Sequence, residues 1–207
     1  MRFIGDVHGD FARYEQLIGE TGQSVQIGDL GLGYGTVGAD GVVMRPDPPF
    51  DVMKRAGSHR FIRGNQDDPA MCRQSELWIA DGTVDGDVFY CGGAETARRQ
   101  NRIEGVNWWP DEELSEAEFA AVHEKYLDAK PRLMVTHDCP VSIGAEILAA
   151  HDIGKPVAVT RTRKSFEAML ALHKPQIWIF GHWHLPFDRQ IGSTRFICLD
   201  ILQTIDL

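Results

Sequence analysis

The chain has 207 residues, with 21 Lys and Arg against 30 Asp and Glu, so its formal net charge is −9. This length fits one domain with a full hydrophobic core, which we expect to span residues 1–207. The acidic balance argues against a protein that grips long nucleic acid, because such binding depends on many cationic contacts with phosphates. It leaves room for a small phosphate ester held by metal ions, which would neutralise some of the acids locally.

The N-terminus and the cysteines indicate where the protein is expected to be located and the state of its thiols. The N-terminus lacks the pattern of a signal peptide, and no segment approaches the ~20 apolar residues of a membrane helix, so we expect a cytoplasmic protein without membrane contact. The four cysteines form no C-x-x-C pair, which favours reduced, mostly buried thiols over a zinc finger or a disulfide framework. The sequence does not predict an oligomeric state.

Short apolar runs alternate with helical patterns along the chain, as is typical of an α/β protein. In the first half, we expect strands at 2–4, 24–27, 60–63 and 88–91, and a helix at 11–19. In the second half, we expect strands at 132–136, 176–180, 187–191 and 194–199, the last two forming a hairpin. Ser115 and Glu118 form a capping box that predicts a helix to about residue 127, and a further helix is expected at 165–172.

Two segments look irregular. Residues 31–49 are dense in glycine and proline, which resist the interior of a helix or strand. This segment is either a mobile surface loop or a lid that selects substrates, since long loops in compact domains are often functional. The second segment covers residues 95–111.

Residues that can bind metal ions stand directly after five predicted strands. Because the carboxyl ends of strands form the ligand-binding edge of open α/β sheets, these residues can converge although they span the whole sequence. In an extended segment, Asp6 and His8 point to the same side and can reach one ion. Taken singly, each residue could be a turn acid, a cap or a core histidine, but jointly they indicate a metal site. The set comprises Asp6, His8, Asp29, Asn65, His137, His182 and His184.

These strand ends carry five motifs in order, and with them the chain resembles a calcineurin-like metallophosphoesterase. Residues 107–115 also resemble small bacterial and phage members of that family, which are often labelled serine/threonine-type phosphatases. The resemblance covers almost the full length and implies a four-layer α/β/β/α sandwich with the site at its edge. The motifs are Gly5-Asp6-Val7-His8-Gly9, Gly28-Asp29, Gly64-Asn65-Gln66-Asp67, Thr136-His137-Asp138 and Gly181-His182-Trp183-His184.

The resemblance also implies a dinuclear centre. Asp6, His8, Asp29 and His184 would hold one ion, and Asp29 would bridge to a second held by Asn65, His137 and His182. Mixed imidazole and oxygen ligands suit Mn²⁺, Fe, Zn²⁺ or Ni²⁺ better than Ca²⁺. We expect two Mn²⁺ ions, with Fe, Zn²⁺, Ni²⁺ or Mg²⁺ as alternatives. The two ions would activate a shared water for in-line attack on phosphorus. Asp138 is either a residue that orients a histidine ligand or an acid of the turn.

Gln66 departs from the family pattern, because it stands where the third motif normally carries a histidine. A glutamine amide can form hydrogen bonds but cannot shuttle a proton near neutral pH. Losing a general acid typically costs ~10²–10⁴ in rate. Three interpretations stay open: a preference for phosphodiesters or activated esters, an active phosphatase with an inactivating substitution, or a metal-binding but inactive interaction module.

The second irregular segment is the candidate substrate side. Arg98, Arg99 and Arg102 could bind phosphate oxygens, and Trp108 could stack on a base or ring. The alternative is a basic surface patch above core tryptophans. The expected partner is a phosphoester: a small molecule, a nucleotide or a phosphopeptide.

Overall fold

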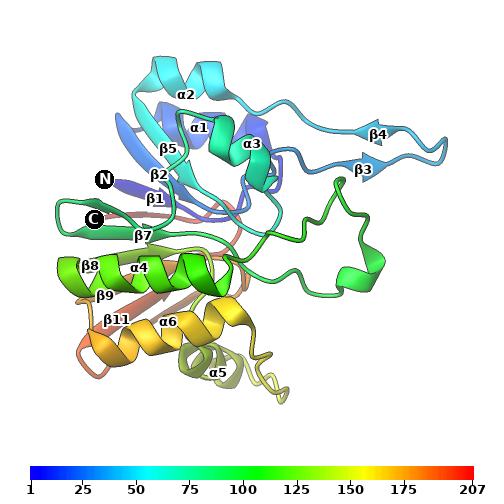
Figure 1. Ribbon diagram of the computed structural model, residues 1–207. Helices are drawn as coiled ribbons and strands as arrows, with labels where there is room; N and C mark the ends of the chain where they lie inside the picture. The colour runs from blue at the N-terminus through cyan, green and yellow to red at the C-terminus, as the bar shows by residue number, and fades with distance from the viewer.

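Two β-sheets pack face to face in the computed structural model, which describes residues 1–207, and helices cover both outer faces (Figure 1). The expected four-layer α/β/β/α arrangement is confirmed. None of the helices has the length and hydropathy that crossing a lipid bilayer would require.

The first sheet has four strands, of which β1, β2 and β5 run parallel and β12 pairs antiparallel with β1. Its order is β12 (Thr204–Asp206), β1 (Arg2–Ile4), β2 (Gln23–Ile27) and β5 (Ser58–Ile62). The helices of this half are α1 (Phe11–Gly19), α2 (Phe50–Ala56) and α3 (Pro69–Gln74).

The second sheet has six strands, with four parallel strands between two antiparallel edge strands. Its order is β10 (Phe187–Ile191), β11 (Thr194–Cys198), β9 (Ile177–Phe180), β8 (Leu133–Thr136), β7 (Val88–Cys91) and β6 (Thr83–Asp85). Its helices are α4 (Glu116–Ala129), α5 (Val141–Ala150) and α6 (Arg161–Leu172).

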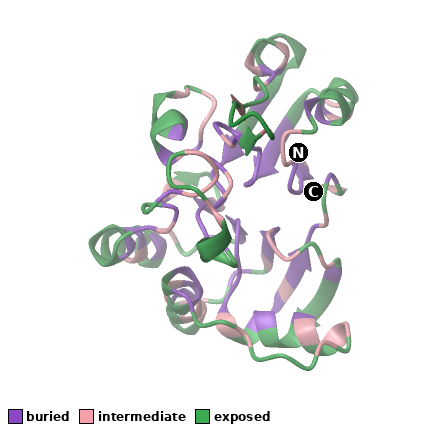
Figure 2. Ribbon diagram, turned by 90° about the vertical axis from the view of Figure 1, so that its right-hand side faces the viewer, coloured by how far each residue is buried: buried purple, intermediate pink, exposed green.

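Three hydrophobic cores separate the four layers, and Figure 2 shows the buried strands enclosed by helices with exposed outer sides. The side chains of a strand alternate between its two faces, so one strand serves two cores. Leu133 and Val135 of β8 pack between the sheets, whereas Met134 packs towards α4, α5 and α6. In the same way, Phe61 of β5 faces the α1 and α2 side, and Ile62 faces the second sheet. Strands apolar on both faces are therefore buried on both faces.

Most predicted elements exist with bounds shifted by a few residues, and the capping box of α4 is present. Eight further elements were not expected from the sequence: α2, α3, α5, β6, β12, the two strands of a hairpin within residues 31–49, and the 3₁₀ helix η1 (Arg99–Asn101). Most of these are short; α5, with ten residues, is not.

Residues 31–49 are not wholly irregular, because they contain a two-stranded hairpin of β3 (Thr36–Val37) and β4 (Val43–Met44). The hairpin projects from the body of the molecule (Figure 1). Its turn is closed by the Gly38 N–H, which donates to the Val42 carbonyl, and by Asp40, whose carboxylate accepts from the Val42 N–H. The expectation of an irregular segment is wrong here because local turn hydrogen bonds suffice to pair two short strands.

The base of this hairpin is tied to residues 95–108, which we call the arginine loop. The Gly35 N–H donates to the Val106 carbonyl at 2.7 Å, and Arg45 donates to the Gly105 carbonyl at 2.9 Å. Arg102 of the arginine loop donates to the Tyr34 hydroxyl. The two segments that looked irregular in the sequence therefore support each other along one side of the molecule.

Candidate metal centre

The seven predicted metal ligands follow five parallel strands, three in the first sheet and two in the second. β1, β2 and β5 lead to Asp6, Asp29 and Asn65, while β8 and β9 lead to His137 and His182. Because both sheets present carboxyl ends at one edge, the side chains meet there. Six of the seven form two groups whose ligand atoms lie within 4.8 Å of one another: Asp6, His8 and His184, and Asp29, His137 and His182.

The first group is crowded in a way that suits a cation. The Nε2 atoms of His8 and His184 are 2.9 Å apart, and the Asp6 Oδ2 lies 2.9 Å from His184 Nε2 and 3.6 Å from His8 Nε2. The hydrogen bond with Asp6 raises the pKa of His184. His8 Nδ1 is buried without a hydrogen-bond partner and lies 3.9 Å from Asp29 Oδ2. Converging imidazole nitrogens and carboxylate oxygens are the donor set of a transition-metal ion.

The second group is oriented by its surroundings. His137 Nδ1 donates to the Ile27 carbonyl at 3.0 Å, which points Nε2 at Asp29 Oδ1, 3.2 Å away. Asn65 Oδ1 lies 3.3 Å from the same nitrogen. Ligating histidines typically donate their other N–H to a carbonyl or carboxylate in this way.

Asp29 stands between the two groups, with Oδ1 towards His137 and Oδ2 towards His8. Burial raises the pKa of Asp29, but His137, His8 and His182 outweigh burial and lower it below its ordinary value. Burial lowers the pKa of His137, but Asp29 outweighs that effect and raises it to about 10. A buried anion facing histidines of both groups fits the bridging role that the resemblance implied.

The backbone at the centre is strained. His8, Asp29, His182 and His184 all have positive φ angles, between 51° and 67°. Left-handed conformations of residues other than glycine cost roughly 1–2 kcal/mol each and cluster at functional sites. His182 and His184 join different groups, so the backbone does not hold this i, i+2 pair against one ion.

Two glycines allow the close approach of these strand ends. Gly28 has a φ of 99°, and a Cβ added there would lie 2.3 Å from His137 Nδ1. A Cβ at Gly64 would lie 2.1 Å from Asp29 Oδ1. Both positions exclude any larger residue unless the ligands move.

Gln66, the residue at the departure from the family pattern, binds Asp29 directly. Its backbone N–H donates to Asp29 Oδ1 at 2.7 Å, and its side-chain amide donates to Oδ2 at 3.2 Å. An amide donor holds the carboxylate in place but offers no titratable proton at neutral pH.

Asp138 is buried and binds three donors, so it is more than an acid of an exposed turn. Its carboxylate accepts from Arg163 Nε at 2.7 Å, Trp183 Nε1 at 2.9 Å and the Cys139 N–H at 2.8 Å. It also lies 4.0 Å from His182 Nε2. Burial raises the pKa of Asp138, but His182 and Arg163 outweigh burial and lower it.

His182 itself is kept neutral. Burial lowers its pKa to about 4, against the opposing effect of Asp138. A neutral imidazole is the form that binds a metal ion.

Three supporting residues were not assigned from the sequence. Asp67 is fully buried and accepts from the backbone N–H groups of Gly64, Gly31, Leu32 and Leu30, at 2.7, 2.8, 2.9 and 3.2 Å. It thereby clamps the loop of Asp29 to the loop of Asn65. Its place near Asn65 in the third motif was a signal, but three of its four partners, Leu30, Gly31 and Leu32, lie on a different strand end.

The other two supports are Thr96 and Glu112. Asn65 Nδ2 donates to Thr96 Oγ1 at 3.1 Å, and Thr96 is held in turn by the Glu112 carboxylate. Because the amide nitrogen of Asn65 is engaged, its oxygen faces the metal-binding atoms. No motif or spacing around Thr96 or Glu112 in the sequence indicates that they orient Asn65.

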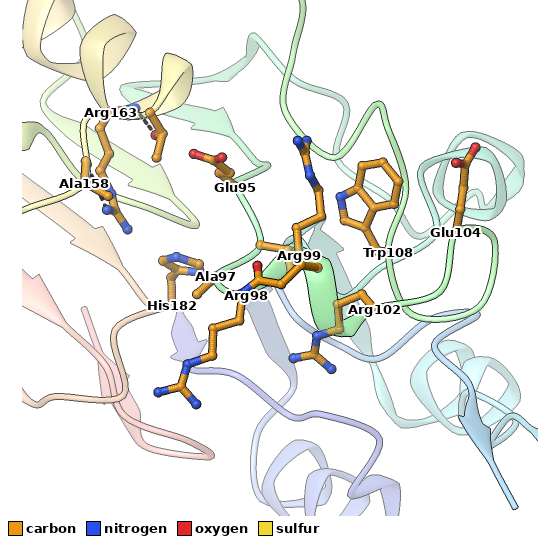
Figure 3. A pocket seen from close by; sticks show the side chains of 13 residues that line it. Glu95, Ala97, Arg98, Arg99, Arg102, Glu104, Trp108, Ala158, Arg163 and His182 are labelled. Atoms are coloured by element: carbon orange, nitrogen blue, oxygen red, sulfur yellow. Dashed lines mark hydrogen bonds between the residues drawn. The ribbon is translucent and has the colours of Figure 1, made fainter.

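A cavity of about 830 Å³ opens beside the second group and is lined by His182, Arg163 and the arginine loop (Figure 3). The predicted substrate residues Arg98, Arg99, Arg102 and Trp108 all line it. The Arg99 guanidinium lies over the Trp108 ring, 5.0 Å from the ring centroid, and so covers one of its two faces. Trp109 is buried in the protein.

The residues present therefore fit two divalent cations.

Similar solved structures share this architecture. A phosphopantetheinyl hydrolase of Mycobacterium tuberculosis aligns with a TM-score of 0.50 at 13% identity, over 97% of this chain and 89% of that one. A provisionally named 5′-nucleotidase of Staphylococcus aureus aligns with a TM-score of 0.53 at 14% identity, over 97% of this chain. The chain spans about half of that nucleotidase, 48% of its length.

At these identities the likeness concerns the fold alone. The chain has the fold of the calcineurin-like metallophosphoesterases, as its five motifs predicted. No protein-family model and no curated protein matches the chain in sequence.

Proposed function

We propose that this protein is a phosphoester hydrolase that depends on two divalent cations, with Mn²⁺ the best-suited ion. The observation that carries the proposal is the pair of His/Asp groups at one sheet edge, with Asp29 between them. When bound, such cations lower the pKa of water towards ~7 and neutralise the phosphoryl oxygens. The two similar structures, named as a nucleotidase and a hydrolase of phosphopantetheinyl groups, support the same reaction class.

The protein's own residues then orient the substrate. Arg163 is fixed through Nε to Asp138 and through Nη1 to the Ala158 carbonyl at 3.1 Å, and its Nη2 makes no hydrogen bond within the chain. Because Arg163 lines the cavity beside His182, this free nitrogen is available to a phosphoryl oxygen. Asn65 contributes an oriented oxygen, and Gln66 holds Asp29.

Protonation of the leaving group is the step for which this site offers no evident donor at the position of Gln66. Gln66 donates to Asp29 and cannot deliver a proton. We therefore propose that esters with good leaving groups, and phosphodiesters in particular, react faster than alkyl phosphomonoesters. Asp138 is proposed to act through His182, whose orientation it supports.

The first test measures release of p-nitrophenolate from bis(p-nitrophenyl) phosphate by the metal-free protein and after addition of Mn²⁺. Metal-dependent turnover that Asp29→Asn abolishes is the expected result. Bound Mn²⁺ without turnover would refute the enzyme and favour the alternative, a metal-binding interaction module.

A second experiment addresses Gln66. Gln66→His should raise the rate with alkyl phosphomonoesters, by up to ~10²–10⁴ if the histidine protonates the leaving group. The rate with bis(p-nitrophenyl) phosphate should change little, because p-nitrophenolate leaves without a proton. Equal rates of wild type and variant on monoesters would show that this position does not govern the leaving group.

A further inference from the structure

The arginine loop concentrates positive charge in an acidic protein. The cavity is lined by Arg98, Arg99, Arg102 and Arg163 and by only two acids, Glu95 and Glu104, although the whole chain carries a net charge of −9. Arg163 is neutralised by Asp138, 2.7 Å away. The three arginines of the loop form no ion pair, whereas six other arginines of the chain do.

The backbone of the loop fixes the directions in which its three arginine side chains extend. Arg98 has a left-handed backbone, with φ 56° and ψ 41°, immediately before the short 3₁₀ helix η1 (Arg99–Asn101). Arg98 and Arg102 extend to the same side of the loop, while Arg99 extends away from them beside Trp108 (Figure 3). Such a backbone is costly for a residue other than glycine, and it persists where the surroundings require it.

Aromatic side chains restrain two of the three loop arginines. Arg99 packs on the Trp108 ring, and Arg102 lies 5.7 Å from the Tyr34 ring centroid while donating to the Tyr34 hydroxyl. Tyr34 belongs to the segment that the Gly35 N–H ties to Val106. Stacking on an aromatic ring restrains a guanidinium and leaves its N–H fork free to bind an anion.

A single scissile phosphate does not need these arginines. Arg163 and the candidate ligand His182 line the same cavity, and together with the bound cations they would hold that phosphate. Arg98 and Arg102 extend to the same side of the loop, and two guanidinium groups on one side of a short loop repel one another unless an anion lies between them. Arginine forks match phosphate oxygens in a bidentate manner.

From this geometry, and resting on the proposed function, we infer that the substrate carries a second phosphate group, which the arginine loop binds while the first is hydrolysed at the metal centre. The inferred substrate class is therefore a small phosphoester with two separate phosphates, for which the cavity of about 830 Å³ has room. A phosphopeptide with one phosphate would leave the loop arginines unused.

The test compares two chromogenic phosphodiesters that differ only in a second phosphate: thymidine 5′-(p-nitrophenyl phosphate) and the same compound with a 3′-phosphate. With free Mn²⁺ held constant, the 3′-phosphorylated compound should have a kcat/KM at least tenfold higher, mainly through a lower KM. Arg98→Ala and Arg102→Ala, the two arginines that extend to the same side of the loop, should each reduce this ratio about tenfold to a hundredfold, the range for a lost hydrogen bond to a charged group. Arg98→Lys should reduce it less, since it keeps the charge and loses the fork.

Arg189→Ala is the matched control, because Arg189 is an exposed arginine on β10 without an ion pair, outside the cavity. It should leave the ratio unchanged. A ratio near one in the wild type, with both compounds hydrolysed, would overturn the second-phosphate subsite and leave the proposed function intact. No hydrolysis of either compound with Mn²⁺ bound would instead refute the proposed function. A high ratio that survives both alanine substitutions would place the second phosphate elsewhere and overturn the role of the loop.

Discussion

Asp67 offers a sharp test of how the metal centre is held together. Its Oδ1 accepts from the N–H groups of Gly31 and Leu32, and its Oδ2 accepts from those of Gly64 and Leu30. Asp67→Asn keeps the shape of the side chain but replaces one oxygen with an NH₂ group. If the amide oxygen keeps its hydrogen bonds with Gly31 and Leu32, the N–H groups of Gly64 and Leu30 face the new NH₂ group. Both N–H groups then lack an acceptor.

The expected loss of stability follows from these two buried N–H groups without an acceptor. A buried polar group without a partner costs about 1–3 kcal/mol, so two of them lower the free energy of unfolding by about 2–6 kcal/mol. For a chain of this size, a loss of 4 kcal/mol corresponds to roughly 8–16 °C in the melting temperature. The affinity for Mn²⁺ should also fall, by about 10–100-fold, because both clamped loops carry ligands.

The assay is urea unfolding followed by tryptophan fluorescence in the presence of a chelator, with Mn²⁺ binding measured separately by calorimetry. Asp68→Asn is the control, because Asp68 caps α3 through hydrogen bonds to the N–H groups of Ala70 and Met71. Asparagine caps helices about as well as aspartate, so this neighbouring substitution should cost little. Equal effects of the two substitutions on stability and on metal affinity would refute the clamp.

Three other predictions use the same measurements. Gly28→Ala should lose Mn²⁺ binding, because its Cβ would lie 2.3 Å from His137 Nδ1, whereas Gly86→Ala, with no atom within 4 Å of the added Cβ, should bind normally. Ser115→Ala should lower the free energy of unfolding by about 1 kcal/mol, because it removes the N-terminal cap of α4. The hydrogen bond with Ser115 also lowers the pKa of Glu118. The stabilisation by this pair is therefore present above the ordinary glutamate pKa of about 4.3 and is lost as the pH falls through the lowered pKa. A stability difference between wild type and Ser115→Ala that persists unchanged in acid would contradict this prediction. Saturating the metal-free protein with Mn²⁺ at about 100 times its dissociation constant should raise the free energy of unfolding by about 2.7 kcal/mol, and an unchanged melting temperature would contradict a pre-built centre.

The sequence by itself determined the order of the main strands and the residues that follow them. Strands such as 133–136 and 177–180 are apolar on both faces, a local pattern that can be read without a structure. The candidate ligands stand beside glycine or threonine at those strand ends, so their convergence followed from the general geometry of parallel sheets. The capping box of α4 is equally local.

Only the tertiary structure decided the contacts between segments far apart in the chain. Asp67 reaches the N–H groups of another loop, Thr96 orients Asn65 across 31 residues, and Arg163 holds Asp138 from a helix 25 residues away. The arginine loop depends on Tyr34, 68 residues from Arg102, for its support. A local pattern has no period or spacing that encodes such pairings, because they arise when the two sheets pack and bring their strand ends to one edge.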